Sequence, residues 1–258
     1  MTWVAAMASA ELPEAACVAD IQITFKYRNK EVTHNGLRKV YRITHSLAVA
    51  FSGTVSIAFR LLGNMRQQEA PLHDKPHALM TSWPTSAARV FRASQKKEKE
   101  GVGLLVLGLD HNHSGQPMPF VYKLESPDFT PYKANGAELL SIGCGTRQYA
   151  AAIQNTCNEP NSFRAYERRE FRGRGIGIGL VGMMAMEWRS QPAKGVSEEL
   201  LCCIVSPYDS VDFPYRASIG NASTGETRQV GMPQLATSWA EVQRIAKSLG
   251  LSAAGAIC

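Results

Sequence analysis

The fold is decided by residues 39–62, which read KVYRITHSLAVAFSGTVSIAFRLL. Two short apolar runs, Lys39–Ile43 and Ser46–Phe51, flank a Thr-His turn and predict a hairpin of two strands. From Gly53 to Gln68 the apolar residues recur every three or four positions, which is typical of an amphipathic helix. A pair of strands therefore runs into a helix through a turn of small residues.

The rest of the chain continues this mixture of strands and helices. Further strands are predicted at Thr2–Ala8, Cys17–Phe25, Val102–Leu109, Phe120–Glu125, Glu138–Ile142 and Leu200–Val205. Further helices are predicted at about 78–100, 146–157, 176–189 and 238–249. The closing residues, 251–258, are either a docked tail or a frayed end. This order of elements predicts an α+β protein in which helices cover both outer faces of stacked sheets.

The composition is that of a globular chain with no membrane or nucleic-acid signature. With 258 residues, of which 45% are hydrophobic and 19% charged, the chain can bury a full core, and we expect one domain over residues 1–258. No apolar run approaches the roughly 18 residues that a membrane span needs, so we expect no membrane partner. The 28 Lys and Arg against 22 Asp and Glu give a net charge of +6, too mild to imply nucleic acid.

Cysteine and histidine usage bears on the compartment and on metal binding. The six cysteines show no CxxC spacing, which favours the reducing cytoplasm. His111 and His113 lie in a turn rich in polar residues, where such residues are expected for the turn itself. We therefore predict no metal and no cofactor.

The candidate chemistry begins at Thr2. Removal of Met1 would leave Thr2 with a hydroxyl nucleophile and a free α-amine, whose ordinary pKa near 8 suits a general base. Asp20 ends one predicted strand and Lys39 begins another, so the two could meet below that amine. Lys39 would favour the neutral form of the amine, and Asp20 would hold Lys39 in place.

These residues resemble the proteasome β-subunit family of N-terminal nucleophile (Ntn) hydrolases, in its bacterial-type form. Thr2, Asp20 and Lys39 stand in the order and at nearly the spacing of the family's catalytic Thr, Asp and Lys. Residues 39–62 look like the family's strand, strand, turn and first helix, while LLVLGLD at 104–110 and LSIGCG at 140–145 look like its later strands. The resemblance spans most of the first 205 residues.

The resemblance implies both a fold and an activity. The fold would be a four-layer αββα sandwich, a single Ntn-hydrolase domain in which residues 207–258 form a family-atypical C-terminal extension. The activity would be that of a cytoplasmic threonine endopeptidase acting on polypeptides inside a closed homo-oligomeric ring. An ATPase or other unfoldase would be its partner.

The resemblance also places the residues that contact the substrate. The backbone N–H groups around Ser52 and Gly53 would form the oxyanion hole. Residues Ile23, Leu37, Ala50 and Thr54 would line the pocket for the residue before the cut bond. None of the four is charged, so we expect cleavage after Leu, Phe, Tyr or Met.

Two departures from the family pattern leave alternatives open. Cys144 stands where the family has a serine that supports the terminal amine, and a thiol is a weaker hydrogen-bonding group. Residues 189–198 lack the family's Asp-x-x-Ser-Gly-Gly pattern. The chain could therefore be a catalytically inactive ring or scaffold subunit, or an Ntn amidase that acts on a small molecule.

Overall fold

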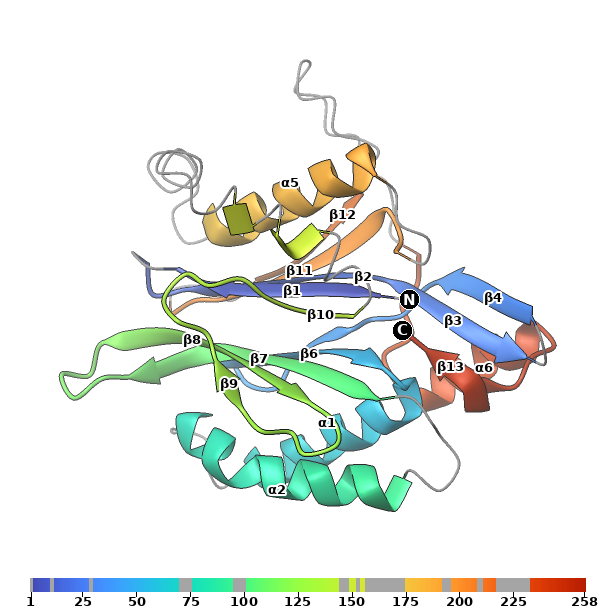
Figure 1. Cartoon of the computed structure of the whole chain (residues 1–258), viewed down its shortest axis with the longest axis horizontal. Helices are drawn as coiled ribbons and strands as arrows, with labels where there is room; N and C mark the ends of the chain where they lie inside the picture. The colour runs from blue at the N-terminus through green and yellow to red at the C-terminus, as the bar shows by residue number, and fades with distance from the viewer. Residues whose placement is uncertain are drawn as a thin grey trace.

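Two five-stranded antiparallel sheets lie face to face in the middle of the molecule (Figure 1). The structure, a computed structural model, describes residues 2–9, 12–27, 30–69, 76–94, 101–143, 149–151, 154–155, 175–191, 196–207, 211–216 and 233–258. The first sheet has the order β10 (Leu140–Gly143), β1 (Trp3–Ala8), β2 (Ala15–Asp20), β11 (Glu199–Val205), β12 (Val211–Arg216). The second has the order β5 (Val40–Arg42), β6 (Leu47–Gly53), β7 (Val102–His111), β8 (Pro117–Glu125), β9 (Tyr132–Lys133).

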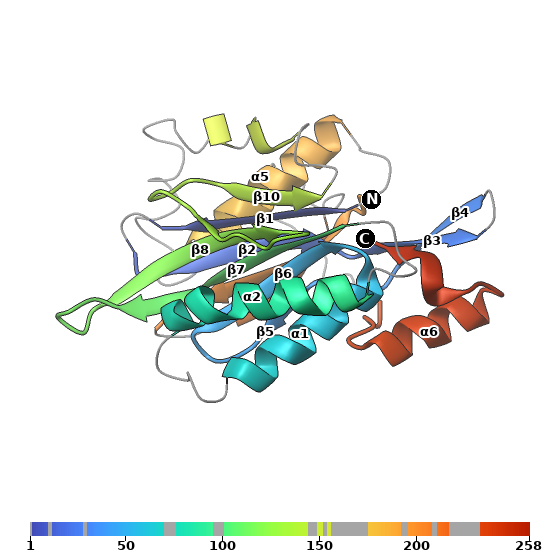
Figure 2. The ribbon, with the colours of Figure 1, turned by 60° about the horizontal axis from the view of Figure 1, so that its bottom comes forward.

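Helices lie on the outer faces of these two sheets. Helix α5 (Gly175–Ser190) covers the first sheet, and α1 (Val55–Glu69) and α2 (Pro76–Ser94) cover the second (Figures 1 and 2). The apolar residues that predict the amphipathic helix α1 are all buried, which confirms it: Val55, Ile57, Ala58, Leu61, Leu62 and Met65. No helix in the described ranges is both long enough and apolar enough to cross a membrane.

A third sheet makes the predicted four-layer αββα sandwich wrong. The described residues form three mostly antiparallel sheets and five helices, and the third sheet has the order β13 (Ala256–Ile257), β3 (Gln22–Tyr27), β4 (Lys30–Asn35). The predicted strand Cys17–Phe25 breaks at Ile21, where Asp20 Oδ2 accepts the backbone N–H of Gln22 and the Ser197 hydroxyl accepts that of Ile21. The chain before the break stays in the first sheet, and the chain after it leaves the stack.

The side chains of β6 alternate between two hydrophobic cores. Ala48 and Ala50 face the core shared by the two large sheets, which is built largely of small side chains. Leu47, Val49 and Phe51 face the helices α1 and α2. Neighbouring residues of a strand point to opposite faces, so every second residue of β6 enters the same core.

The C-terminal residues pack against the rest of the chain. Helix α6 (Trp239–Ser248) begins at the N-cap Ser238, whose side chain accepts the backbone N–H of Glu241, and it buries Val242 and Ala246. A short 3-10 helix, η3 (Ala253–Gly255), leads into β13 at the edge of the third sheet. The structure thus places residues 251–258 as a docked tail.

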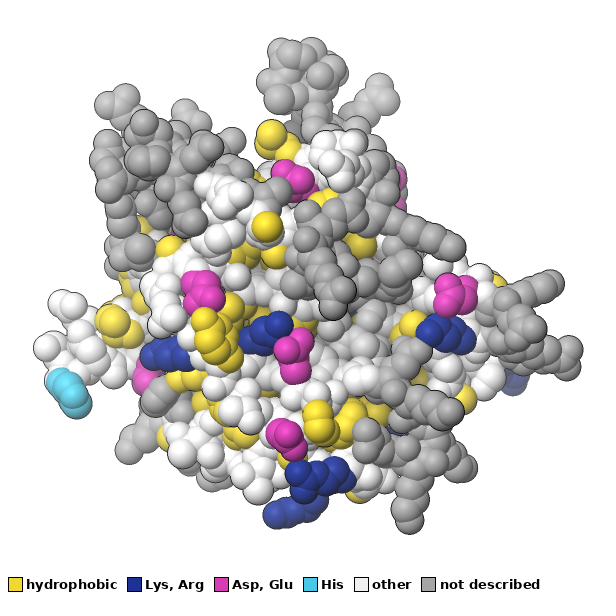
Figure 3. All heavy atoms as spheres, viewed as in Figure 1, with side chains coloured by type: hydrophobic (Ala, Val, Ile, Leu, Met, Phe, Trp, Pro, Cys, Tyr) yellow, Lys and Arg dark blue, Asp and Glu magenta, His cyan; other side chains and the backbone are white. Residues whose placement is uncertain are grey.

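The surface mixes charges of both signs. On the face drawn in Figure 3, Lys and Arg side chains lie among Asp and Glu side chains rather than gathering in one patch. Arg38 and Arg42 both contact the Asp212 carboxylate, at 2.5 and 3.3 Å. Two basic side chains thus share one carboxylate there.

Candidate active site

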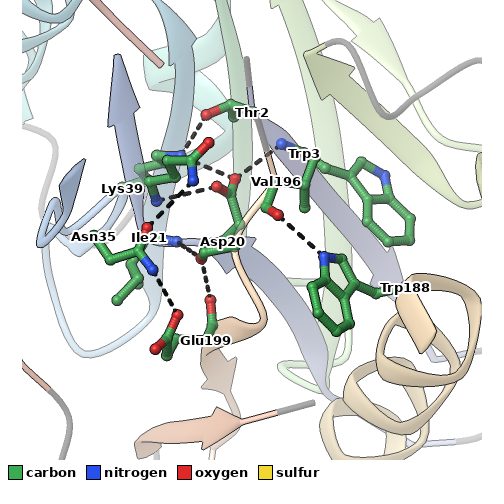
Figure 4. Close-up of polar contacts among 11 residues, drawn as sticks. Thr2, Trp3, Asp20, Ile21, Asn35, Lys39, Trp188, Val196 and Glu199 are labelled. Carbon is green, nitrogen blue, oxygen red and sulfur yellow. Dashed lines mark hydrogen bonds and ion pairs between the residues drawn. The ribbon is translucent and has the colours of Figure 1, made fainter. Parts of the chain in front are cut away.

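Thr2, Asp20 and Lys39 come from separate segments of the chain and meet in the structure, where the buried Lys39 links the other two. The Lys39 ammonium donates a hydrogen bond to the Thr2 hydroxyl and another, of 2.9 Å, to Asp20 Oδ1 (Figure 4). Thr2, Asp20 and Lys39 are 1%, 0% and 0% exposed. The structure therefore brings together the nucleophile, the carboxylate and the amine that the sequence singles out.

Strand pairing explains why these residues meet. Strands β1 and β2 are antiparallel with Val4 opposite Ala19, so the beginning of β1 lies beside the end of β2. The backbone N–H of Trp3 donates to Asp20 Oδ1 at 2.9 Å, and that of Gln22 donates to Oδ2 at 3.1 Å. Two backbone donors and one ammonium thus fix the carboxylate, and the carboxylate in turn orients Lys39.

Stability alone does not account for this ion pair. Removing two charges from water costs several kcal/mol each, and apolar replacements of a buried pair are often neutral or stabilising. Lys39 also directs an N–H to a threonine hydroxyl, a group that gives back far less Coulomb energy than a second carboxylate would. One N–H of the buried Lys39 ammonium is therefore directed at the Thr2 hydroxyl.

A serine that the sequence analysis missed supports the turn behind Asp20. The Ser197 hydroxyl accepts the backbone N–H of Ile21 at 3.1 Å and donates to the Glu199 carbonyl at 2.8 Å. The Glu199 side chain accepts from Asn35 at 2.9 Å, which ties the first sheet to the third (Figure 4). Ser197 lies in the stretch 189–198 that departs from the family pattern, and its only signal in the sequence is its place just before β11.

Gly143 packs closely against the backbone of Thr2. It lies across from Trp3 in the β1–β10 ladder with a φ of 92°, a backbone conformation that favours glycine. A Cβ at this position would lie 2.2 Å from the Thr2 carbonyl oxygen. Cys144, the predicted support for the terminal amine, lies outside the described residues.

Of the two predicted oxyanion donors, Gly53 is the one whose N–H points to the site. It donates to the Cys258 carbonyl oxygen at 2.6 Å, while Ser52 lies opposite Gly103 within the second sheet. Gly53 has a φ of 98°, and a Cβ there would lie 2.1 Å from the Gly101 carbonyl oxygen. Glycine is therefore required at this turn, and its N–H is directed at a carbonyl.

The predicted substrate pocket is brought together only in part. Ile23 and Leu37 belong to the same buried cluster as Cys258, and Thr54 is buried and forms a backbone bridge with Ile257. Ala50 belongs to the core between the two large sheets, so the structure does not bring it to the other three. Phe51, its neighbour in β6, faces the cluster instead, as the two-residue period of a strand requires.

Cys258 is buried near the three central residues, and its side chain interacts with Thr2. Burial raises the pKa of the Cys258 thiol to about 11, while the nearby charge of Lys39 and a hydrogen bond with Thr2 act in the opposite direction. The chain reaches this position through Gly255, where a Cβ would lie 2.8 Å from the Lys26 carbonyl oxygen. The sequence alone does not place this tail, because its apolar residues resemble those of any buried end.

The free energy of unfolding is expected to fall as the pH rises above about 9. A thiol with a pKa near 9 when unfolded and about 11 when folded contributes stability that is present below pH 9 and lost as the pH approaches 11. The loss is about 1 kcal/mol per such thiol at pH 10. Urea unfolding at pH 8 and pH 10 measures it, and Cys258→Ala should reduce the drop by this amount. An equal drop in the variant would contradict the assignment.

Comparison with known proteins adds no relatives to this picture. No protein-family model matches the chain, and no curated protein matches it with significance. The arrangement of Thr2, Asp20 and Lys39 around one buried ammonium therefore carries the functional argument.

Proposed function

We propose that this protein is a threonine-type peptidase that uses Thr2 as its N-terminal nucleophile once Met1 is removed. The observation that carries the proposal is the fully buried Lys39 ammonium, which bridges the Thr2 hydroxyl and the Asp20 carboxylate. The resemblance to proteasome β-subunits adds support, because the same three residues carry it. A cytoplasmic location, a homo-oligomeric ring and an ATPase or other unfoldase partner stay predictions from the sequence.

In the first half of the proposed reaction, the Thr2 hydroxyl oxygen attacks the carbonyl carbon of the scissile peptide bond. The free α-amine of Thr2 takes the hydroxyl proton, and Lys39 favours the neutral form of that amine. The negative charge that develops on the substrate oxygen is stabilised by the Gly53 N–H. The amine then passes its proton to the leaving nitrogen as the C–N bond breaks, which leaves an ester on Thr2.

The second half releases the acyl product. The α-amine takes a proton from a water molecule, and the resulting hydroxide attacks the ester carbonyl in the same oxyanion site. The C–O bond to Thr2 breaks, and the Thr2 oxygen regains a proton from the amine. One peptide bond and one water molecule give one carboxylic acid and one amine, with no cofactor needed for the balance.

A covalent probe tests this assignment directly. A peptide epoxyketone needs both a hydroxyl and an α-amine on the same residue to form its ring, so it should modify Thr2 in protein that lacks Met1. The labelling should be done on the wild-type chain and on Gly255→Ala, in which the added Cβ displaces the tail. Peptide mapping by mass spectrometry should locate the adduct at Thr2 and find none in Thr2→Ala. Absence of an adduct from both proteins after Met1 removal would contradict the proposal.

A catalytically inactive scaffold subunit is the second candidate. It is favoured by the burial of Thr2, which is 1% exposed with the tail in place. The two candidates differ in one respect: an inactive subunit should give no Thr2 adduct even when the tail is displaced.

Substituting Gly143 is expected to impair catalysis through Thr2. The Cβ of Gly143→Ala would push the Thr2 carbonyl, and a displacement of about 1 Å can cost about 10²-fold in rate. Gly136→Ala is the matched control, because Gly136 also has a positive φ but has open space around its Cβ. Both variants should lose about 1–2 kcal/mol or more from backbone strain, and only Gly143→Ala should lose hydrolysis. Equal activity in the two would show that Gly143 does not position Thr2.

A further inference from the structure

Residues 256–258 of the tail lie between strand β3 and the Gly53 turn, and the space that they fill is called the groove. Strand β13 pairs antiparallel with β3, with Ala256 opposite Phe25 and Ile257 opposite Thr24. On its other side Ile257 bridges Thr54, and Cys258 exchanges two backbone hydrogen bonds with Gly53, of 2.9 and 2.6 Å. The last residues are therefore held as a strand on both edges.

The backbone oxygen of Cys258 makes the contact that the proposed mechanism gives to the oxygen of the reacting carbonyl. It accepts the N–H of Gly53, the proposed oxyanion donor. The Cys258 side chain lies beside Thr2 and joins the cluster that holds Ile23 and Leu37. The chain ends marked N and C in Figures 1 and 2 lie side by side at this point.

An extended peptide uses the same kinds of contact when it binds a sheet edge. Backbone hydrogen bonds give such a peptide its affinity and direction, and pockets for its side chains give selectivity. Residues 256–258 make the backbone contacts to β3 and to Gly53, and Cys258 stands where the residue before the cut bond would stand. A peptide substrate and the tail cannot occupy this groove together.

We infer that residues 256–258 are a substrate-like intramolecular inhibitor, which must leave the groove before a polypeptide can reach Thr2. The inference rests on the proposed peptidase function. A rate measured on the docked protein is then reduced to the fraction of molecules whose tail is released.

The tail can be released without loss of its anchor. Helix α6 is held separately, by Val242 and Ala246 in the core and by the backbone of Ala236, which bonds to Gly36 and Arg38. The displaced part begins at Gly255, whose Cα approaches the Lys26 backbone so closely that no Cβ fits. Gly255→Ala should therefore expel β13 and Cys258 while α6 stays in place.

The experiment compares the full-length wild type with Gly255→Ala and with Gly63→Ala. Gly63 lies on α1 with no atom within 4 Å of an added Cβ, so its variant is a matched control. Alkylation of Cys258, followed by peptide mapping, reports the tail, and hydrolysis of a fluorogenic peptide reports the site. Gly255→Ala should raise both rates at least about tenfold, and Gly63→Ala should leave both at the wild-type values.

Three outcomes separate this inference from the proposed function. If Gly255→Ala exposes Cys258 but hydrolysis, abolished by Thr2→Ala, stays at the wild-type rate, the inhibitor role is overturned while the peptidase stands. Rapid alkylation of Cys258 in the wild type would overturn the docked tail itself. If neither protein shows hydrolysis or a Thr2 adduct, the peptidase proposal fails, and the inhibitor role fails with it.

A synthetic peptide tests the groove without any catalysis. A fluorescent peptide of the sequence SAAGAIC, residues 252–258, should bind Gly255→Ala and raise its fluorescence anisotropy, with at least tenfold weaker binding to the wild type. Equal binding to the two proteins, or none to Gly255→Ala, would contradict occupation of the groove by the tail.

Discussion

Replacing Thr2 with alanine is expected to lower peptide hydrolysis by about 10³-fold or more, because it removes the only hydroxyl that the Lys39 ammonium contacts among the described residues. The comparison of hydrolysis rates should be made in the Gly255→Ala background, since the groove is then open and the parent rate is expected to be higher. Thr2→Ser keeps the hydroxyl and should retain a measurable part of the rate. Initial rates with a fluorogenic peptide measure all three proteins, after intact mass has established that Met1 is absent from each.

An unfolding transition measured on Thr2→Ala is the control that this variant is folded. Thr2→Ala removes one hydroxyl and one methyl group at a buried site, so we expect a loss of about 1–2 kcal/mol, far too little to unfold the protein. A Thr2→Ala protein that keeps more than about a tenth of the parent rate would exclude Thr2 as the nucleophile.

The second large effect is expected from uncoupling the buried ion pair. Lys39→Met or Asp20→Asn leaves one buried charge without its partner, which should cost about 3–5 kcal/mol of folding free energy. The double variant Asp20→Asn with Lys39→Met removes both charges and keeps an acceptor for the Trp3 N–H. We expect it to unfold with a free energy within about 2 kcal/mol of the parent.

Activity separates a catalytic pair from a structural one. If Lys39 acts on the Thr2 amine, hydrolysis should fall at least about 10²-fold in the single variants and stay lost in the double variant, although its stability returns. Denaturant unfolding and peptide hydrolysis on the same four proteins make a double-mutant cycle. Activity that returns together with stability would assign the pair to folding alone.

Sequence patterns predicted the central residues because local and long-range signals agree there. Thr2, Asp20 and Lys39 each stand at the end of an apolar run, and strand pairing brings strand ends together. Helix α1 is equally predictable from the sequence, since its apolar residues recur with the period of an amphipathic helix.

The errors have equally specific causes. Nothing local marks Ile21 as the point where one apolar run divides between two sheets, because the break depends on hydrogen bonds to Asp20 and Ser197. Ala50 is predicted to lie beside Leu37 in the substrate pocket, but the side of a strand that a residue faces depends on register, and a shift of one residue reverses it. Cys258 reaches Thr2 only through the tertiary structure.

The contact between Gly53 and Cys258 also has a consequence for how each molecule is synthesised and folds. The two residues are more than 200 positions apart in the chain, so this is among the most non-local contacts in the fold. Contacts of such long range form late in folding, and during synthesis Cys258 leaves the ribosome long after Gly53. A growing chain thus contains β3 and the Gly53 turn well before it contains the residues that pack between them.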